Sequence, residues 1–183
     1  MAKVTAISGY KPFELGIYKN DHPAVKYIKT AIKRHLLNLL DEGLEWVLIS
    51  GQLGVECWSA EVVLELQDEY PDLKLAILTP FLEQEEKWSD QNKEYYEMIS
   101  AQADFYESIS RQPYQSPSQF QVKNRLFLHK SDCLIMMYDE QQEGSPKYFL
   151  EEARKYKDTI QYDIRIIDFY ELQVIMEEDQ WNM

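Results

Sequence analysis

The feature of this 183-residue chain that most limits its fold is the alternation of short apolar runs with longer amphipathic segments. Apolar runs at residues 4–7, 46–49 and 73–78 are typical of buried strands, and the segments between them carry apolar residues at helical spacing. Two further runs, at 133–138 and 164–167, come later. This alternation predicts right-handed helical crossovers between parallel strands. We therefore predict an α/β fold around a mostly parallel sheet of about five strands.

Length and composition favour a single domain that spans residues 1–183. The hydrophobic fraction is 45% and the charged fraction 28%, both ordinary for a globular protein, and we find no repeat or linker. The least regular stretch, residues 104–114, is either a short strand or a loop over the sheet edge. Cys57 and Cys133 lie in apolar surroundings and are expected to be small buried hydrophobic residues rather than a disulfide framework.

The charge balance argues against several classes of partner. Because 32 acidic and 19 basic residues give a formal net charge of −13, the chain is a poor candidate for coating nucleic acid, which is bound through Lys and Arg. No apolar run approaches the roughly 20 residues of a membrane helix, and no signal-peptide pattern is present, so we expect a cytoplasmic protein without a membrane partner. The three histidines are scattered without metal-ligand spacing, and no metal site is predicted.

A turn with two glycines separates the second apolar run from the helix that follows it. It consists of Ser50, Gly51, Gln52, Leu53 and Gly54. The start of a helix presents unpaired backbone N–H groups and the positive end of the helix dipole, which together favour an anion such as phosphate. Glycine lets a ligand approach the backbone closely. A βα turn also uses glycine for its own geometry, so a motif this short leaves both explanations open.

Other strand ends carry residues that suit a ligand, and ligands of open parallel sheets bind beyond the carboxyl ends of the strands. These residues are Gly9, Tyr10 and Lys11 after the first run, Thr79, Pro80 and Phe81 after the third, and Gly144 and Ser145 after the run at 133–138. Lys11 and two helix starts predict a local positive site in an acidic chain. Tyr10 and Phe81 either stack on a base or pack beneath a loop. Glu56 either complements the helix dipole or bonds a sugar hydroxyl.

These motifs resemble those of a known superfamily. The turn at 50–56 is similar to the glycine turn of SLOG proteins, which include the DNA-processing protein DprA and the "lonely guy" phosphoribohydrolases. Residues 123–125 (K-N-R), 131–132 (S-D) and 144–145 (G-S) follow in the order of the R-N-R, S-D and G-S motifs of DprA. Nearly the whole chain looks like the YpsA family, a group of bacterial cytoplasmic proteins.

The resemblance implies a Rossmann-like three-layer sandwich that binds a nucleotide or nucleotide sugar, such as an ADP-ribose-like molecule, with no certain cofactor. It implies that Arg125 reaches the ligand phosphate and that Asn124 fixes the neighbouring loop, whereas Lys123 is expected to face solvent. An arginine on a solvated helix face is the plainer explanation of Arg125. The family's suggested tie to cell division or stress makes a protein partner of that kind an expectation. A homodimer is one arrangement that the sequence allows.

We expect a sensor or regulatory protein rather than an enzyme. The phosphoribohydrolases carry P-G-G-x-G-T-x-x-E, with catalysis by the final Glu. Aligning Gly144 and Ser145 with G-T puts Tyr148 at that position, and the double glycine is absent. Glu151 and Glu152 lie about one turn further along, within reach of a shifted register. Nucleotide N-glycoside hydrolysis is therefore the alternative activity, with its catalytic residues unknown, and a protein-interaction module with a vestigial pocket is the third hypothesis.

Overall fold

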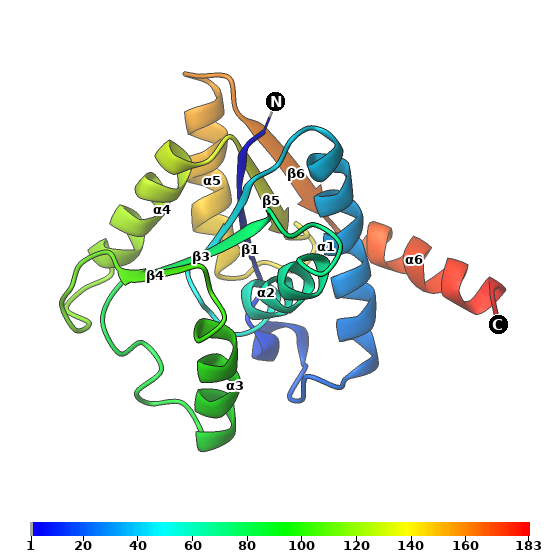
Figure 1. The fold of residues 1–183 in the computed structure, drawn as a ribbon, viewed down its shortest axis with the longest axis horizontal. Helices are drawn as coiled ribbons and strands as arrows, with labels where there is room; N and C mark the ends of the chain where they lie inside the picture. The colour runs from blue at the N-terminus through cyan, green and yellow to red at the C-terminus, as the bar shows by residue number, and fades with distance from the viewer. Residues whose placement is uncertain (1) are drawn as a thin grey trace.

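Six parallel strands form one sheet, and helices cover both of its faces (Figure 1). The structure is a computed structural model that describes residues 2–183. Its elements in chain order are β1 (Val4–Gly9), a 3₁₀ turn η1 (Pro12–Leu15), α1 (Pro23–Asp41), β2 (Trp46–Ile49), α2 (Val55–Leu66), β3 (Lys74–Thr79), α3 (Asp90–Ser100), β4 (Phe105–Ser108), α4 (Ser118–Lys130), β5 (Cys133–Met137), α5 (Pro146–Lys157), β6 (Asp163–Ile167) and α6 (Phe169–Trp181).

The sheet confirms the predicted α/β class and contains one strand more than predicted. Its order is β4-β3-β2-β1-β5-β6, and every pairing is parallel. The additional strand is β4, which lies in the irregular stretch 104–114 and pairs with β3 at the sheet edge. Phe105 and Tyr106 are 47% and 46% exposed. An edge strand that stays half in solvent lacks the continuous apolar pattern by which buried parallel strands are recognised.

The helices form two layers because the chain reverses direction across the sheet. From β1 to β4 it moves outward strand by strand, and α2 contacts both α1 and α3 while α1 also contacts α6. After β4 the chain returns through α4 to β5, beside β1, and α4 packs against α5. In Figure 1, α4 and α5 lie on one side of the strands and α1 and α6 on the other. The strand order therefore reverses between β1 and β5.

The core follows from the sequence pattern. All five residues of β5 are buried, as expected for a central strand covered on both faces. Helix α1 buries the predicted stripe at helical spacing, namely Val25, Ile28, Ile32, Leu36 and Leu39. It begins at Pro23, where the His22 side chain accepts a hydrogen bond from the Ala24 N–H. Within residues 2–183, every helix is too short or too polar to cross a lipid bilayer.

Candidate functional site

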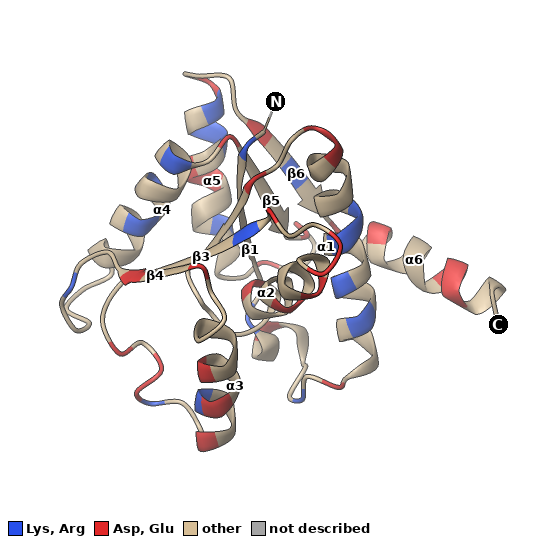
Figure 2. Ribbon diagram, in the orientation of Figure 1, with Lys and Arg blue, Asp and Glu red and all other residues tan. Residues whose placement is uncertain are grey.

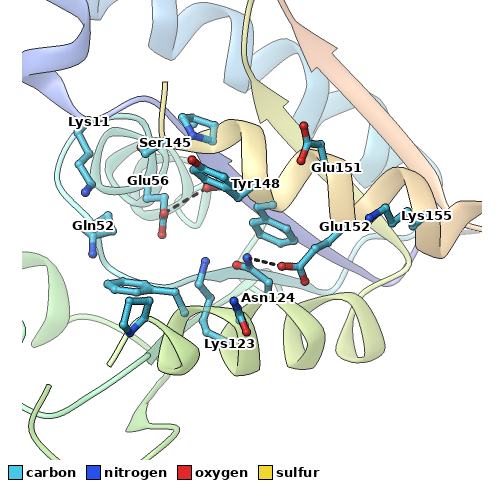
Figure 3. Close-up of a pocket in the computed structure, with 17 residues that line it drawn as sticks. Lys11, Gln52, Glu56, Lys123, Asn124, Ser145, Tyr148, Glu151, Glu152 and Lys155 are labelled. Carbon is cyan, nitrogen blue, oxygen red and sulfur yellow. Dashed lines mark hydrogen bonds between the residues drawn. The ribbon is translucent and has the colours of Figure 1, made fainter. Parts of the chain in front are cut away.

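A cavity of about 550 Å³ lies at the carboxyl end of β1, between the amino-terminal parts of α4 and α5 and the start of α2 (Figure 3). This is the edge at which the strand order reverses, where ligands of open α/β sheets bind. Its volume falls within the range of small-molecule sites. The lining residues are Ser8, Gly9, Lys11, Gln52, Glu56, Pro117, Phe120, Gln121, Lys123, Asn124, Ser145, Pro146, Tyr148, Phe149, Glu151, Glu152 and Lys155.

The structure brings only some of the predicted site residues to this cavity. Those that line it are Gly9, Lys11, Gln52, Glu56, Asn124 and Ser145. Those that do not are Tyr10, Ser50, Gly51, Leu53, Gly54, Thr79, Pro80, Phe81, Arg125 and Gly144. Thr79 and Pro80 are buried at the end of β3, two strands away from β1. The cavity therefore lies toward α4 and α5 and takes in fewer strand ends than the sequence predicts.

The two glycines of the turn before α2 make room for other parts of the chain. Gly54 has a φ of 93°, and a Cβ added there would lie 2.4 Å from the Tyr10 carbonyl oxygen. Gly51 has a φ of 85°, and an added Cβ would lie 2.8 Å from the Gln84 side-chain nitrogen. The Val55 N–H at the start of α2 donates to the Tyr10 carbonyl at 3.1 Å. Both glycines are thus explained by turn geometry and by contacts within the protein.

Glu56 places its carboxylate where the sequence pattern suggests a phosphate. Its Oε1 accepts hydrogen bonds from the Ser50 backbone N–H and from Ser50 Oγ, both at 2.7 Å. Its Oε2 accepts from Ser8 Oγ at 3.3 Å. The residue is 4% exposed, so this carboxylate joins the ends of β1 and β2 to α2 from inside the protein. A buried charge is tolerated here because hydrogen bonds satisfy it.

The start of α5 also has an acidic partner within the chain. The Ser145 backbone N–H donates to Glu14 Oε1 at 2.9 Å, and the Lys11 N–H donates to Glu14 Oε2 at 2.9 Å. Glu14 belongs to η1 and therefore holds the loop after β1 against the start of α5. A carboxylate in this position complements the helix dipole, as a bound phosphate would. The backbone amides that the sequence offers to a phosphate are thus partly used by Glu14 and Glu56.

Neither aromatic residue predicted at the site faces the cavity. Tyr10 is fully buried and stacks on Tyr138 with ring centroids 5.7 Å apart. Its hydroxyl donates to the Gln142 carbonyl at 2.6 Å. Phe81 packs against Tyr114 and Phe120, with centroids 5.1 Å and 5.6 Å apart. Phe120 itself reaches the cavity, as do Tyr148 and Phe149, so these three supply the aromatic surface there.

Lys123 is the functional candidate that the sequence reasoning missed, and the expectation that it faces solvent is wrong. Its side chain extends from α4 into the cavity toward Glu56 (Figure 3), and the residue is only 7% exposed. Nζ lies 4.7 Å from the ring centroid of Phe149 and 5.3 Å from that of Phe127. The available signal was helical spacing, since Lys123 lies four residues before the buried Phe127 on the same helix face.

Burial changes the acid–base behaviour of Lys123. Removal of its ammonium from water lowers the pKa of Lys123 from its ordinary value, and the positive charge of Lys11 acts in the same direction. The carboxylates of Glu56 and Glu152 oppose this change in pKa, but burial is the largest cause. The amine therefore loses its proton more readily than the amine of a solvent-exposed lysine.

Asn124 follows Lys123 and is also buried, at 6% exposure. Its Nδ2 donates to Glu152 Oε1 at 3.4 Å, which links α4 to α5 across the cavity (Figure 3). Among residues 2–183, no donor satisfies its buried Oδ1. A buried acceptor without a partner is costly, and a ligand or water would satisfy it. Arg125, by contrast, is exposed on the outer side of α4 and does not line the cavity.

The charges around the cavity differ from those of the whole chain. Figure 2 shows Lys and Arg along α4 and α5, whereas the charged residues of α6 are all acidic. Three lysines reach the cavity: Lys11, Lys123 and Lys155. The cavity also holds the carboxylates of Glu56, Glu151 and Glu152, so it combines cations with hydrogen-bond acceptors. Within the described residues, no group of three or more His, Cys, Asp or Glu side chains is arranged to hold a metal ion.

The fold and the cavity define a class: a Rossmann-like α/β protein with a ligand-sized cavity at the carboxyl edge of its sheet. A sequence model of the YpsA family, described as the YspA SLOG family, matches residues 5–172. UPF0398 proteins of Bacillus cereus strains B4264 and G9842 are each 59% identical over 180 residues, which cover 98% of both chains. One of Bacillus thuringiensis strain Al Hakam is 58% identical over the same share. The chain belongs to the YpsA family of SLOG proteins.

Proposed function

We propose that this protein binds a nucleotide or nucleotide sugar, such as an ADP-ribose-like molecule, in the cavity between α4 and α5. The observation that carries the proposal is a ligand-sized cavity with three lysines and an unsatisfied buried acceptor, at the sheet edge where such ligands bind. The three lysines of the cavity balance its three glutamates, so its lining is less acidic than the chain as a whole, and Lys11 and Lys155 offer cations to a phosphorylated small molecule.

The polar groups match the parts of a nucleotide. Lys11 and Lys155 flank the cavity at opposite ends in Figure 3 and offer cations for phosphate oxygens. Asn124 Oδ1 and the Glu152 carboxylate are acceptors, and hydroxyl groups of a ribose are donors of the kind they need. Phe120 and Tyr148 supply aromatic surface for a base. The ligand is held by these side chains, with fewer contacts to the glycine turn than the sequence motif suggests.

Thermal unfolding with a panel of AMP, ADP, ADP-ribose and NAD tests the proposal. A ligand present at about 100 times its Kd stabilises the folded state by about 2.7 kcal/mol. For a protein of this length, that free energy raises Tm by about 5–10 °C. The Asn124→Leu variant should lose about half of this increase, whereas Lys130→Ala, at the far end of α4, should retain it. If no member of the panel raises Tm, the proposed function is wrong.

Hydrolysis of a nucleotide N-glycosidic bond is a second candidate, favoured by the carboxylates in the cavity. Glu151 and Glu152 line it from α5, and so does Tyr148, which occupies the sequence position of the phosphoribohydrolase glutamate. A carboxylate beside a sugar is the usual catalyst for breaking a glycosidic bond. Release of free base from nucleoside monophosphates, compared between wild type and Glu152→Gln, tests this activity. Binding without base release supports the sensor over the enzyme.

A further inference from the structure

Lys123 is unlike the other lysines of the cavity because it is almost fully removed from water. Lys11 is partly exposed and Lys155 is exposed, whereas Lys123 is 7% exposed. The ion pairs found among residues 2–183 lie elsewhere, and none includes Lys123. Its nearest aromatic surroundings are the rings of Phe127 and Phe149. A buried ammonium without a paired carboxylate is costly, and loss of the proton relieves that cost.

An amine in this environment is a nucleophile. A desolvated lysine near a second cation loses its proton more readily than an exposed lysine, and a neutral amine condenses with aldehydes. Lys11 provides that second cation, and its charge also lowers the pKa of Lys123. The cavity opens the amine to a small molecule while the protein surrounds its alkyl stem. The geometry therefore places the amine of a buried lysine in the wall of a ligand-sized cavity.

We propose that Lys123 forms an imine with the aldehyde of a phosphorylated reducing sugar, either a pentose phosphate or the reducing end of an ADP-ribose-like nucleotide sugar. The inference rests on the proposed function in one respect, since both require a phosphorylated sugar in this cavity. The ring-opened form of such a sugar carries its aldehyde at C1. Cations at Lys11 and Lys155 would hold the phosphate while the aldehyde reaches Nζ of Lys123.

The condensation is balanced without any oxidant or reductant. The nitrogen lone pair of Lys123 attacks the carbonyl carbon, a C–N bond forms, and the carbonyl π electrons move to oxygen, which takes a proton. The nitrogen gives up one proton, which leaves a neutral carbinolamine. The nitrogen lone pair then forms the C=N bond as the C–O bond breaks, the oxygen leaves as water after taking a second proton, and the nitrogen gives up its second proton. Glu56 and Glu152 face Lys123 and are the groups positioned to exchange these protons. The products are one imine and one water.

Borohydride trapping on the wild-type protein tests the inference. D-ribose 5-phosphate or ADP-ribose is incubated with the protein, sodium borohydride converts any imine to a stable secondary amine, and peptide mass spectrometry locates the adduct. We expect the adduct on Lys123 ahead of the exposed Lys130 and Lys155, and its formation should be inhibited by AMP, which has no free aldehyde. Ribose without phosphate should label the protein more slowly.

Variants separate the chemistry from the fold. Lys123→Arg keeps a positive charge but cannot form the imine, so it should lose the adduct while Lys130→Arg keeps it, with Tm recorded for both. Adducts spread over exposed lysines with Lys123 unmodified would overturn the inference, whatever the variants do. If AMP raises Tm but no sugar modifies Lys123, this inference fails and the proposed function stands. If Lys123 is modified while no nucleotide binds, the imine stands and the nucleotide proposal fails.

Discussion

The turn before α2 gives the sharpest test of how the site is built, through substitution of Gly54 by alanine. Gly54 has backbone angles φ 93° and ψ −134°, a region that side chains rarely adopt, and a Cβ there would lie 2.4 Å from the Tyr10 carbonyl oxygen. The backbone conformation alone costs a non-glycine residue about 1–3 kcal/mol. Forcing an extra carbon into a packed contact costs about 1–3 kcal/mol more. We expect Gly54→Ala to lower the free energy of unfolding by about 2–6 kcal/mol.

Gly16→Ala is the matched control for this substitution. Gly16 also has a positive φ, 67°, but no atom lies within 4 Å of its added Cβ. Gly16→Ala should lower the free energy of unfolding only by the cost of placing alanine in a left-handed backbone conformation, about 1–2 kcal/mol. The effect of alanine on the unfolded chain is the same in both variants and cancels in the comparison. The difference between the two variants therefore reports the close contacts of Gly54 with Tyr10 and its neighbours, together with the more restricted backbone conformation of Gly54.

Urea denaturation followed by circular dichroism measures both variants. With an m-value of about 1–3 kcal/mol per M, an additional loss of about 2 kcal/mol moves the midpoint of Gly54→Ala about 1 M below that of Gly16→Ala. Equal midpoints would refute the close approach between Gly54 and Tyr10. A Gly54→Ala variant that is as stable as Gly16→Ala but no longer binds nucleotide would show that the glycine serves the ligand instead.

Three further predictions follow from buried groups at the site and in the sheet. Asn124→Leu should weaken AMP binding about tenfold, which is the loss expected for one buried hydrogen bond. Substitution of the exposed Arg125 by alanine should change the Kd less than about twofold. Calorimetric titration measures both Kd values, and equal losses of affinity would contradict the placement of Arg125 outside the cavity. Glu56→Gln replaces one carboxylate oxygen by an amide donor at a position that accepts three hydrogen bonds. It should lower the free energy of unfolding, measured by urea denaturation, by about 1.5–3 kcal/mol. An unchanged urea midpoint would argue against the hydrogen bonds of Glu56 to Ser8 and Ser50. Burial raises the pKa of Cys133 to about 12 and also raises the pKa of Cys57. A thiol reagent at pH 8 should therefore label both cysteines only after unfolding. Rapid labelling of the native protein would contradict their burial.

The sequence was sufficient to predict the α/β architecture because that architecture depends on the spacing of apolar residues along the chain. Apolar runs identify five of the six strands, and the segments with helical spacing identify the helices between them. In the structure, α1 and α5 begin at Pro23 and Pro146, since proline is favoured at the first helical position. The sequence left β4 open between a strand and a loop because Phe105 and Tyr106 are half exposed, so no buried pattern marks them. The free, buried state of Cys57 and Cys133 confirms their interpretation as core residues.

The site was harder to predict because a sequence motif does not show whether a ligand or another part of the protein occupies the space beside it. Glycine at Gly54 is equally suited to a ligand and to the Tyr10 carbonyl, and only three-dimensional packing distinguishes the two. The carboxylate of Glu56 occupies backbone and hydroxyl donors that an isolated motif leaves open. Lys123 and Arg125 are two positions apart, about 200° around a helix, so they lie on nearly opposite faces and only one of them can point into the cavity. The motif favoured the arginine, whereas the packing against Phe127 selects the lysine.

The proposed binding site for a phosphorylated nucleotide is the cavity between α4 and α5. At 21.8 kDa the protein is suited to two-dimensional NMR, and titration of the isotope-labelled protein with ADP-ribose measures the site directly. Binding in this cavity should cause saturable changes in the amide signals of Gly9, Gln52, Asn124 and Phe149, and those of α6 should not change. Changes confined to α6 or to the β4 edge, or no change at millimolar ligand, would contradict it.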